Sequence, residues 1–120
     1  MFINGKALLN AILSLGEVII CLSIIAFIRA LKDILETFQI TLTEDEVFVF
    51  WNIFLASKHG DVTIDNVNEV IETAISVNSY EKLSEREIQK IIDRLIQLSM
   101  IKKENGNYSV TEKTIVHRLK

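Results

Sequence analysis

Hydrophobic residues recur through residues 81–100 at the three- and four-residue spacing of one helix face. Ser84 and Glu87 can form a capping box at the start of this segment, and Leu83 can pack on Ile88 as a hydrophobic staple. The pattern therefore predicts a helix that starts at Ser84 and buries one aliphatic stripe. The stripe consists of Ile88, Ile91, Ile92, Leu95 and Ile96.

A second capping box, Thr43 with Glu46, opens the segment of residues 43–60. Leu42 and Val47 occupy the staple positions around it, and Gly60 suits the left-handed stop of a helix. We expect the aromatic side of this helix to lie in the core rather than to stack on bases. Its members are Phe50, Trp51, Phe54 and Leu55.

The segment between these two helices predicts a brief strand followed by a third helix. Val62 and Ile64 can form the strand, and the helix is expected to begin near Asp65. Its apolar face would consist of Val67, Val70, Ile71, Ala74 and Ile75.

Residues 99–113 indicate two short strands around a tight turn. The Asn-Gly dipeptide at 105–106 is a strong hairpin signal, because both turn positions require positive φ. A two-residue turn there pairs Lys103 with Tyr108, and it also pairs Ile101 with Val110. In that register Ile101, Tyr108 and Val110 share one face, while Ser109 and Thr111 lie on the other.

The N-terminal segment, residues 7–38, is helical in composition, with Gly16 as its only breaker. Residues 18–28 carry no charge, and apolar side chains fall on nearly every face. We expect a buried core or dimer helix. A membrane anchor is the alternative, although about 20 apolar residues are needed and polar ones interrupt the run. A cleaved signal peptide fits less well. The expected dimer contacts are Leu13, Ile20, Ile24 and Phe27.

The chain has the size and composition of one globular domain, residues 1–120, with 49% hydrophobic and 24% charged residues. Its net charge of −3 is unevenly distributed. Residues 1–81 carry four basic and eleven acidic side chains, whereas residues 82–120 carry nine basic and five acidic ones. The C-terminal part, with a net charge of +4, is thus suited to a polyanion, unless the asymmetry is ordinary scatter of surface charge.

Motifs for catalysis or metal binding are missing from the sequence. The four glycines are isolated, and no nucleophile stands with a base in a known pattern, so we expect no enzyme activity and no cofactor. His59 and His117 lack partners at ligand spacing, which argues against zinc. The single cysteine, Cys21, excludes an internal disulfide and fits a cytoplasmic location.

The predicted order is helix, short strand, helix, capped helix and hairpin, which resembles a winged helix-turn-helix domain. "LSEREIQKIIDRLIQLSMIKKENGNYSVTEK" is similar to the recognition helix and wing of bacterial DNA-binding regulators, including its Tyr108-x-Val110-Thr111-Glu112 ending. The resemblance covers residues 43–113. The long segment from Asp65 to Ser84 departs from the compact turn of that family. The N-terminal helix is an addition, and in such regulators added helices usually make the dimer.

The resemblance implies a fold that is mainly α, with the helix from Ser84 lying in a DNA major groove and the hairpin as a wing. The function implied is sequence-specific binding of double-stranded DNA by a homodimer, at an inverted repeat. Such a protein would be a transcriptional regulator, or a plasmid or phage operator or centromere binder. The expected DNA contacts are Ser84, Arg86, Gln89, Lys90, Arg94, Lys102, Lys103, Asn105 and Asn107.

Two alternatives remain open on the residues alone. Winged-helix folds also serve as protein–protein interaction modules, which the acidic first 81 residues and mixed-sign helix face would suit. The polar helix face could also be merely solvated, and the hairpin merely structural. Asp93 is a difficulty for DNA binding, because its charge would face phosphates unless Lys90 or Gln97 occupies it.

Overall fold

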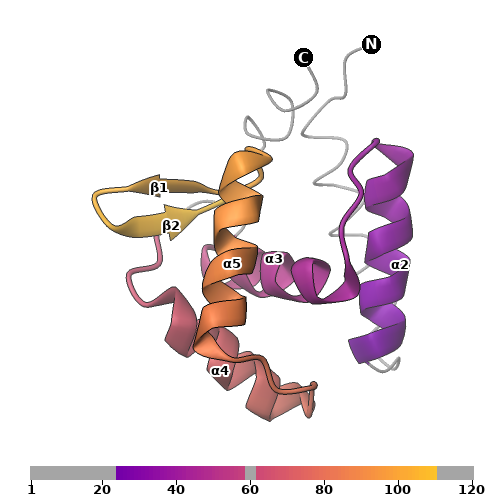
Figure 1. The fold of residues 1–120 in the computed structure, drawn as a ribbon, viewed down its shortest axis with the longest axis horizontal. Helices are drawn as coiled ribbons and strands as arrows, with labels where there is room; N and C mark the ends of the chain where they lie inside the picture. The colour runs from indigo at the N-terminus through magenta and orange to yellow at the C-terminus, as the bar shows by residue number, and fades with distance from the viewer. Residues whose placement is uncertain (1–23, 59–61, 111–120) are drawn as a thin grey trace.

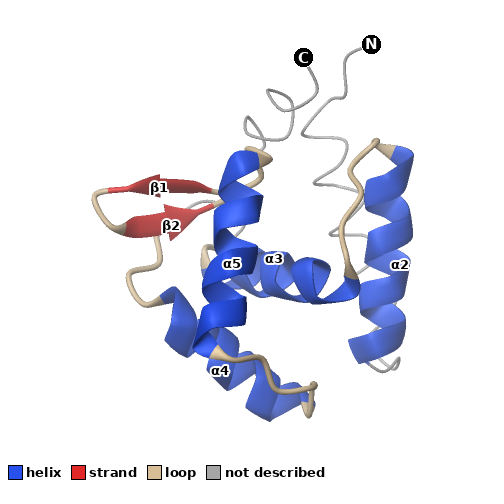
Figure 2. Cartoon of the chain, in the orientation of Figure 1, coloured by secondary structure: helices blue, strands red, loops and turns tan. Residues whose placement is uncertain are grey.

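A computed structural model describes residues 24–58 and 62–110 (Figure 1). In these residues the fold is mainly helical, with a small two-stranded antiparallel sheet (Figure 2). Figure 1 shows α2 at one end of the domain and the hairpin at the other, with α3 and α5 crossing between them. The elements are α2 (Ile24–Thr37), α3 (Glu44–Ala56), α4 (Val67–Asn78), α5 (Glu85–Gln97), β1 (Lys102–Glu104) and β2 (Asn107–Ser109).

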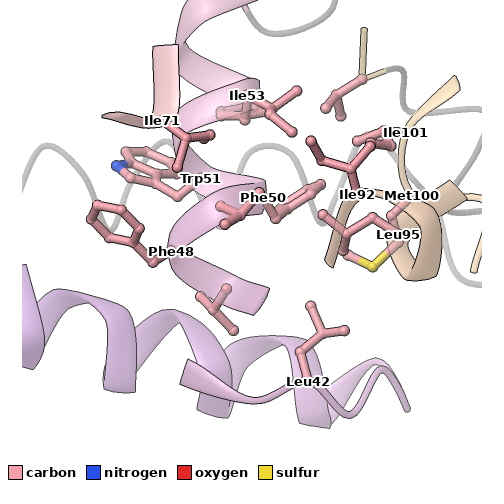
Figure 3. Close-up of a cluster of buried hydrophobic side chains, with 14 of the residues drawn as sticks. Leu42, Phe48, Phe50, Trp51, Ile53, Ile71, Ile92, Leu95, Met100 and Ile101 are labelled. Atoms are coloured by element: carbon pink, nitrogen blue, oxygen red, sulfur yellow. The ribbon is translucent and has the colours of Figure 1, made fainter. Parts of the chain in front are cut away.

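Helix α3 is the centre of the core. Its sequence is apolar on almost every side, so it has to be covered all round, and it packs against α2, α4, α5 and β2. Figure 3 shows Ile71 of α4 on one side of this helix and Ile92 and Leu95 of α5 on the other. The other described helices each contribute one apolar face to this shared core.

The two capping boxes predicted from the sequence are confirmed. In each, the side chain of the cap residue accepts a hydrogen bond from the backbone N–H three residues later, and the glutamate carboxylate accepts one from the backbone N–H of the cap residue. The first joins Thr43 with Glu46, and the second joins Ser84 with Glu87. Leu42 of the first expected staple is buried. These local signals therefore set the starts of α3 and α5.

The C-terminal end of α3 differs in part from the prediction. Phe50, Trp51 and Phe54 are buried as expected, but Leu55 is 46% exposed, so its place in the core stripe was wrong. Because α3 is apolar all round, the spacing alone does not show which side faces solvent. Residue Lys58 takes the left-handed conformation after the helix, with φ 50°. The expected stop at Gly60 lies outside the described residues.

The apolar faces of α4 and α5 follow the predicted spacing. Their central positions are buried, and the flanking positions Val70, Ile75, Ile91 and Ile96 are partly buried against the same core. The fully covered residues are Val67, Ile71, Ala74, Ile88, Ile92 and Leu95.

The long connection between α4 and α5 is tied to α3 by Tyr80. Its ring stacks on Phe48, with centroids 3.9 Å apart and planes inclined by 7°. Its hydroxyl donates a hydrogen bond of 2.6 Å to Asp45 Oδ1. Burial and this carboxylate together raise the pKa of the Tyr80 phenol above its ordinary value. This connection, residues 79–84, is thus held against α3 by an aromatic stack and a polar contact.

The hairpin has the predicted register. Lys103 pairs with Tyr108 across an Asn-Gly turn whose residues have φ of 53° and 80°. Ile101 and Val110 lie one position beyond the paired residues and are both buried, as is Tyr108. Ser109, expected on the opposite face from these, is buried too, so both faces of β2 are covered.

A third backbone segment joins the hairpin. Ile64 forms an antiparallel bridge with Tyr108 of β2, as the predicted brief strand requires. Two hydrogen bonds close it, from Ile64 N to Tyr108 O at 2.7 Å and from Tyr108 N to Ile64 O at 2.8 Å. Val62, the other expected strand residue, is exposed and outside the bridge. The segment before α4 therefore lies against the outer edge of β2.

Only the last part of the predicted N-terminal helix is described. Phe27 of α2 is buried against Trp51 of the same chain, with ring centroids 4.6 Å apart, and Ile24 is half-buried. Packing of Phe27 in its own core leaves it little surface for a second chain. Leu13 and Ile20 lie outside the described residues. Among the described helices, none has the length and apolar character needed to cross a membrane.

Tyr80→Phe should lower stability by about 1 kcal/mol at neutral pH, the usual worth of one hydrogen bond. Because the folded state raises the Tyr80 pKa, folding favours the protonated phenol. That stabilisation is complete below the unfolded pKa, about 10, and is lost as pH rises above it. Urea unfolding from pH 7 to 11 should show the two proteins converging above pH 10. Tyr108→Phe is the control, and a constant gap would contradict the assignment.

Candidate nucleic-acid interface

The outer face of α5 is the most polar helix surface in the described part of the chain. Its aliphatic stripe faces α3, so the remaining positions project to solvent. β1 follows after a short connection and extends away from this helix (Figure 1). The exposed side chains on α5 are Glu85, Arg86, Glu87, Lys90, Asp93, Arg94 and Gln97.

Arg94, an expected DNA contact, is engaged by the fold. Its Nε lies 2.6 Å from Oε2 of Glu46, a residue that is only 7% exposed. The other carboxylate oxygen of Glu46 accepts the backbone N–H of Thr43 at 2.9 Å. One carboxylate thus caps α3 and binds α5, and Arg94 neutralises a charge that burial would otherwise penalise. From the sequence, Glu46 was already accounted for as a capping residue. Nothing in the sequence therefore indicated that it would also bind Arg94.

Asp93 has a hydrogen-bond partner, Gln89, that was not predicted from the sequence. Gln89 Nε2 donates a hydrogen bond to Asp93 Oδ1 at 3.0 Å. The interaction spans one helical turn, which brings side chains at i and i+4 together. Neither Lys90 nor Gln97 takes this place. The pair keeps its negative charge, because glutamine is neutral.

Arg86 and Lys90 are the cations of α5 that are left for a ligand. Both are exposed, and within the described residues neither belongs to an ion pair. Ser84, by contrast, is exposed but uses its hydroxyl to cap α5. The donors that remain at the start of α5 are therefore the neighbouring backbone N–H groups and the Arg86 side chain.

The hairpin carries two lysines on adjacent positions of β1. Lys102 lies 3.4 Å from Glu104, an exposed pair of little energetic weight. Lys103 Nζ lies 5.5 Å from the centroid of the Tyr108 ring, within the range of a cation–π contact. Asn105 is at the exposed turn, and Asn107 is half-buried in β2. Lys103, Glu104 and Asn105 are therefore the exposed polar side chains of the hairpin, and one of the three is acidic.

A groove of about 610 Å³ runs along one flank of α5, where the first turn of α3 meets it. It brings together side chains that the sequence places more than forty positions apart, and its carboxylates outnumber its cations. Arg94 and Glu46 neutralise each other there. The lining residues are Thr43, Asp45, Glu46, Glu87, Lys90, Ile91, Asp93, Arg94 and Gln97.

The positive charge of the C-terminal part is divided at residue 110. Residues 82–110 hold six basic and four acidic side chains, a net charge of +2. The remaining +2 of residues 82–120 belongs to residues 111–120, which lie outside the described part along with Thr111 and Glu112. The described interface is therefore only mildly basic, and its cations are concentrated on α5 and β1.

No group of three or more histidine, cysteine, aspartate or glutamate side chains within residues 24–58 and 62–110 is arranged to hold a metal ion. Comparison of the chain with protein-family models, curated proteins and solved structures found no match.

The Glu46–Arg94 pair should be worth more than an exposed pair of the same chemistry. Glu46→Gln keeps the capping geometry, because glutamine also serves at this position, so a double-mutant cycle with Arg94→Gln isolates the ion pair. We expect a coupling energy of about 1–2 kcal/mol in urea unfolding.

The chain supplies its own control for this cycle. Arg29 Nε lies 2.7 Å from Glu44 Oε1, but the Glu44 side chain is 41% exposed, against 9% for Glu46. Its coupling should fall below about 0.5 kcal/mol, because solvent screens an exposed pair. Equal coupling in the two cycles would show that burial of Glu46 adds nothing.

Proposed function

We propose that residues 43–110 form a winged helix-turn-helix domain and that the protein binds specific duplex DNA sequences as a homodimer. In this proposal α5 is the recognition helix, and β1 and β2 are the wing. The biological role would be that of a transcriptional regulator, or an operator or centromere binder of a plasmid or phage.

The bridge between Ile64 and Tyr108 carries the structural side of the proposal. It places a third segment beside β2, between α3 and α4 in sequence. The resulting order is helix, strand, helix, helix and hairpin. The first strand, at Ile64, lies along the edge of the last strand, β2. A four-helix bundle with an unrelated hairpin would have no need for these two long-range hydrogen bonds.

The accessible cations of α5 and the hairpin support DNA as the ligand. Arg86 and Lys90 are accessible on the helix, and Lys102 and Lys103 on the wing. Arginine and lysine bind guanine edges and phosphates, which are the two main targets on duplex DNA. Arg94 is assigned to the fold instead, because its guanidinium is bound to Glu46.

A two-fold symmetric dimer predicts the form of the site. Two recognition helices would contact major grooves about one helical turn apart, roughly 34 Å, so the sequence should be an inverted repeat. We assign dimerisation to the N-terminal region, residues 7–38, without Phe27, which packs in the core of its own chain.

Lys103→Glu tests the wing. The substitution removes a cation beside the phosphates, so binding should weaken for every sequence, and the slope of log affinity against log salt should fall by about 1. Fluorescence anisotropy with a selected duplex, from 50 to 300 mM salt, measures both. Lys32→Glu on α2 makes the same charge change away from α5 and the hairpin, and light scattering verifies that this variant is still a dimer. If both variants change affinity and salt dependence by the same amount, the hairpin does not contact DNA.

Arg86→Ala tests the recognition helix. If Arg86 contacts a base edge, the variant should lose about 1–3 kcal/mol of discrimination at one base pair per half-site and keep the rest of the preference. Random-duplex selection with the parent and variant proteins shows this directly. An equal loss of affinity for all sequences would assign Arg86 to phosphate. Failure of the parent protein to enrich any sequence would refute the proposed function.

Protein recognition is the second candidate function, and the groove beside α5 favours it. Its lining contains Asp45, Glu87 and Asp93, which would repel phosphates but suit a basic segment of another protein. Under this alternative, duplex DNA would not bind at low salt, and Asp93→Lys, which leaves the capping box intact, would abolish capture of the partner.

A further inference from the structure

Asp93 lies in the middle of the exposed face of α5. The positions Arg86, Lys90, Asp93 and Gln97 are spaced four, three and four residues apart, so they form one stripe along the helix. Asp93 is exposed, and the described residues offer it no ion pair. A duplex that meets Arg86 and Lys90 in its major groove therefore also meets a carboxylate.

Resting on the DNA-binding function proposed above, we propose that Asp93 is a specificity-determining residue that accepts a hydrogen bond from the N4 amino group of a cytosine. Cytosine presents only this donor in the major groove. Guanine presents two acceptors, and thymine presents an acceptor and a methyl group, so both leave the carboxylate unpaired. Adenine presents its amino donor beside the acceptor N7. A carboxylate that accepts from the amino group would therefore lie close to N7 as well.

Gln89 is the positioning residue for this contact. Its amide donates to Asp93 Oδ1 at 3.0 Å, which leaves Oδ2 as the oxygen without a partner in the described residues. An oriented carboxylate loses less rotamer freedom when it binds a base than a free one does. Gln89 adds no charge, so it holds Asp93 in place without neutralising it.

The neighbouring cations keep the charge of Asp93 available. Arg94 is adjacent in sequence, but its guanidinium is bound to Glu46 on the flank of α3. Lys90 is the nearest other cation on the same stripe and remains exposed. A negative charge on a DNA-facing helix opposes binding to every duplex, and a cytosine at one position offsets that cost. Asp93 thus contributes to specificity mainly by weakening the binding of duplexes that lack this cytosine.

The test is Asp93→Asn, which keeps the size of the side chain and removes its charge. Affinity for a random-sequence duplex should rise several-fold, because repulsion of phosphates is lost. In a random-duplex selection, the preference for cytosine at one position per half-site should fall by about tenfold, the usual range for one base pair. Gln89→Ala should weaken the same preference without raising affinity for random DNA. Glu72→Gln, at an exposed position of α4, is the control and should change neither quantity.

The outcomes separate this inference from the function on which it rests. If the parent protein enriches a sequence and Asp93→Asn enriches the same one with unchanged preferences, Asp93 has no part in specificity, while DNA binding stands. If the variant only raises affinity for all duplexes alike, Asp93 is a general repulsive charge and the cytosine contact is refuted. If the parent enriches no sequence, both ideas fail. A thermal unfolding curve for each variant tests whether the fold is intact.

Discussion

The burial of α3 on nearly all sides is the constraint on which the rest of the structure depends. A helix of this composition is stable in water only when other elements cover it, and α2, α4, α5 and β2 all pack against it. Each of the three helices has one apolar face, and that face is turned toward α3. The polar face of α5 therefore projects outward as a consequence of core packing, before any ligand is considered.

Glu46 links the packing around α3 to the polar surface of α5. Its carboxylate holds the first turn of α3 and the last turns of α5 together, through Thr43 and Arg94. A single buried charge thus selects which arginine of α5 serves the fold and which ones remain for a ligand. The same contact brings acidic side chains of α3 beside the helix, so only part of the α5 surface suits a polyanion.

Much of the fold could be predicted from local sequence signals, because those signals have local physical causes. The capping boxes and the Asn-Gly turn depend on neighbouring residues alone, and they gave the correct starts of two helices and the correct hairpin register. Leu55 was misplaced, because periodicity carries no direction in a helix that is apolar all round. The Glu46–Arg94 pair and the Gln89–Asp93 pair were missed. The first depends on how two distant segments pack, and the second on which of several possible partners a side chain selects.

The Ile64–Tyr108 bridge has a consequence for how the chain acquires its structure. The contacts within each helix are local, whereas this bridge joins positions on either side of α4 and α5. Loop closure over such a distance has to precede any gain from the two hydrogen bonds. We expect the helices to assemble around α3 first and the hairpin to dock last. In native-state hydrogen exchange, the amides of β1 and β2 should therefore open at lower free energy than those of α3.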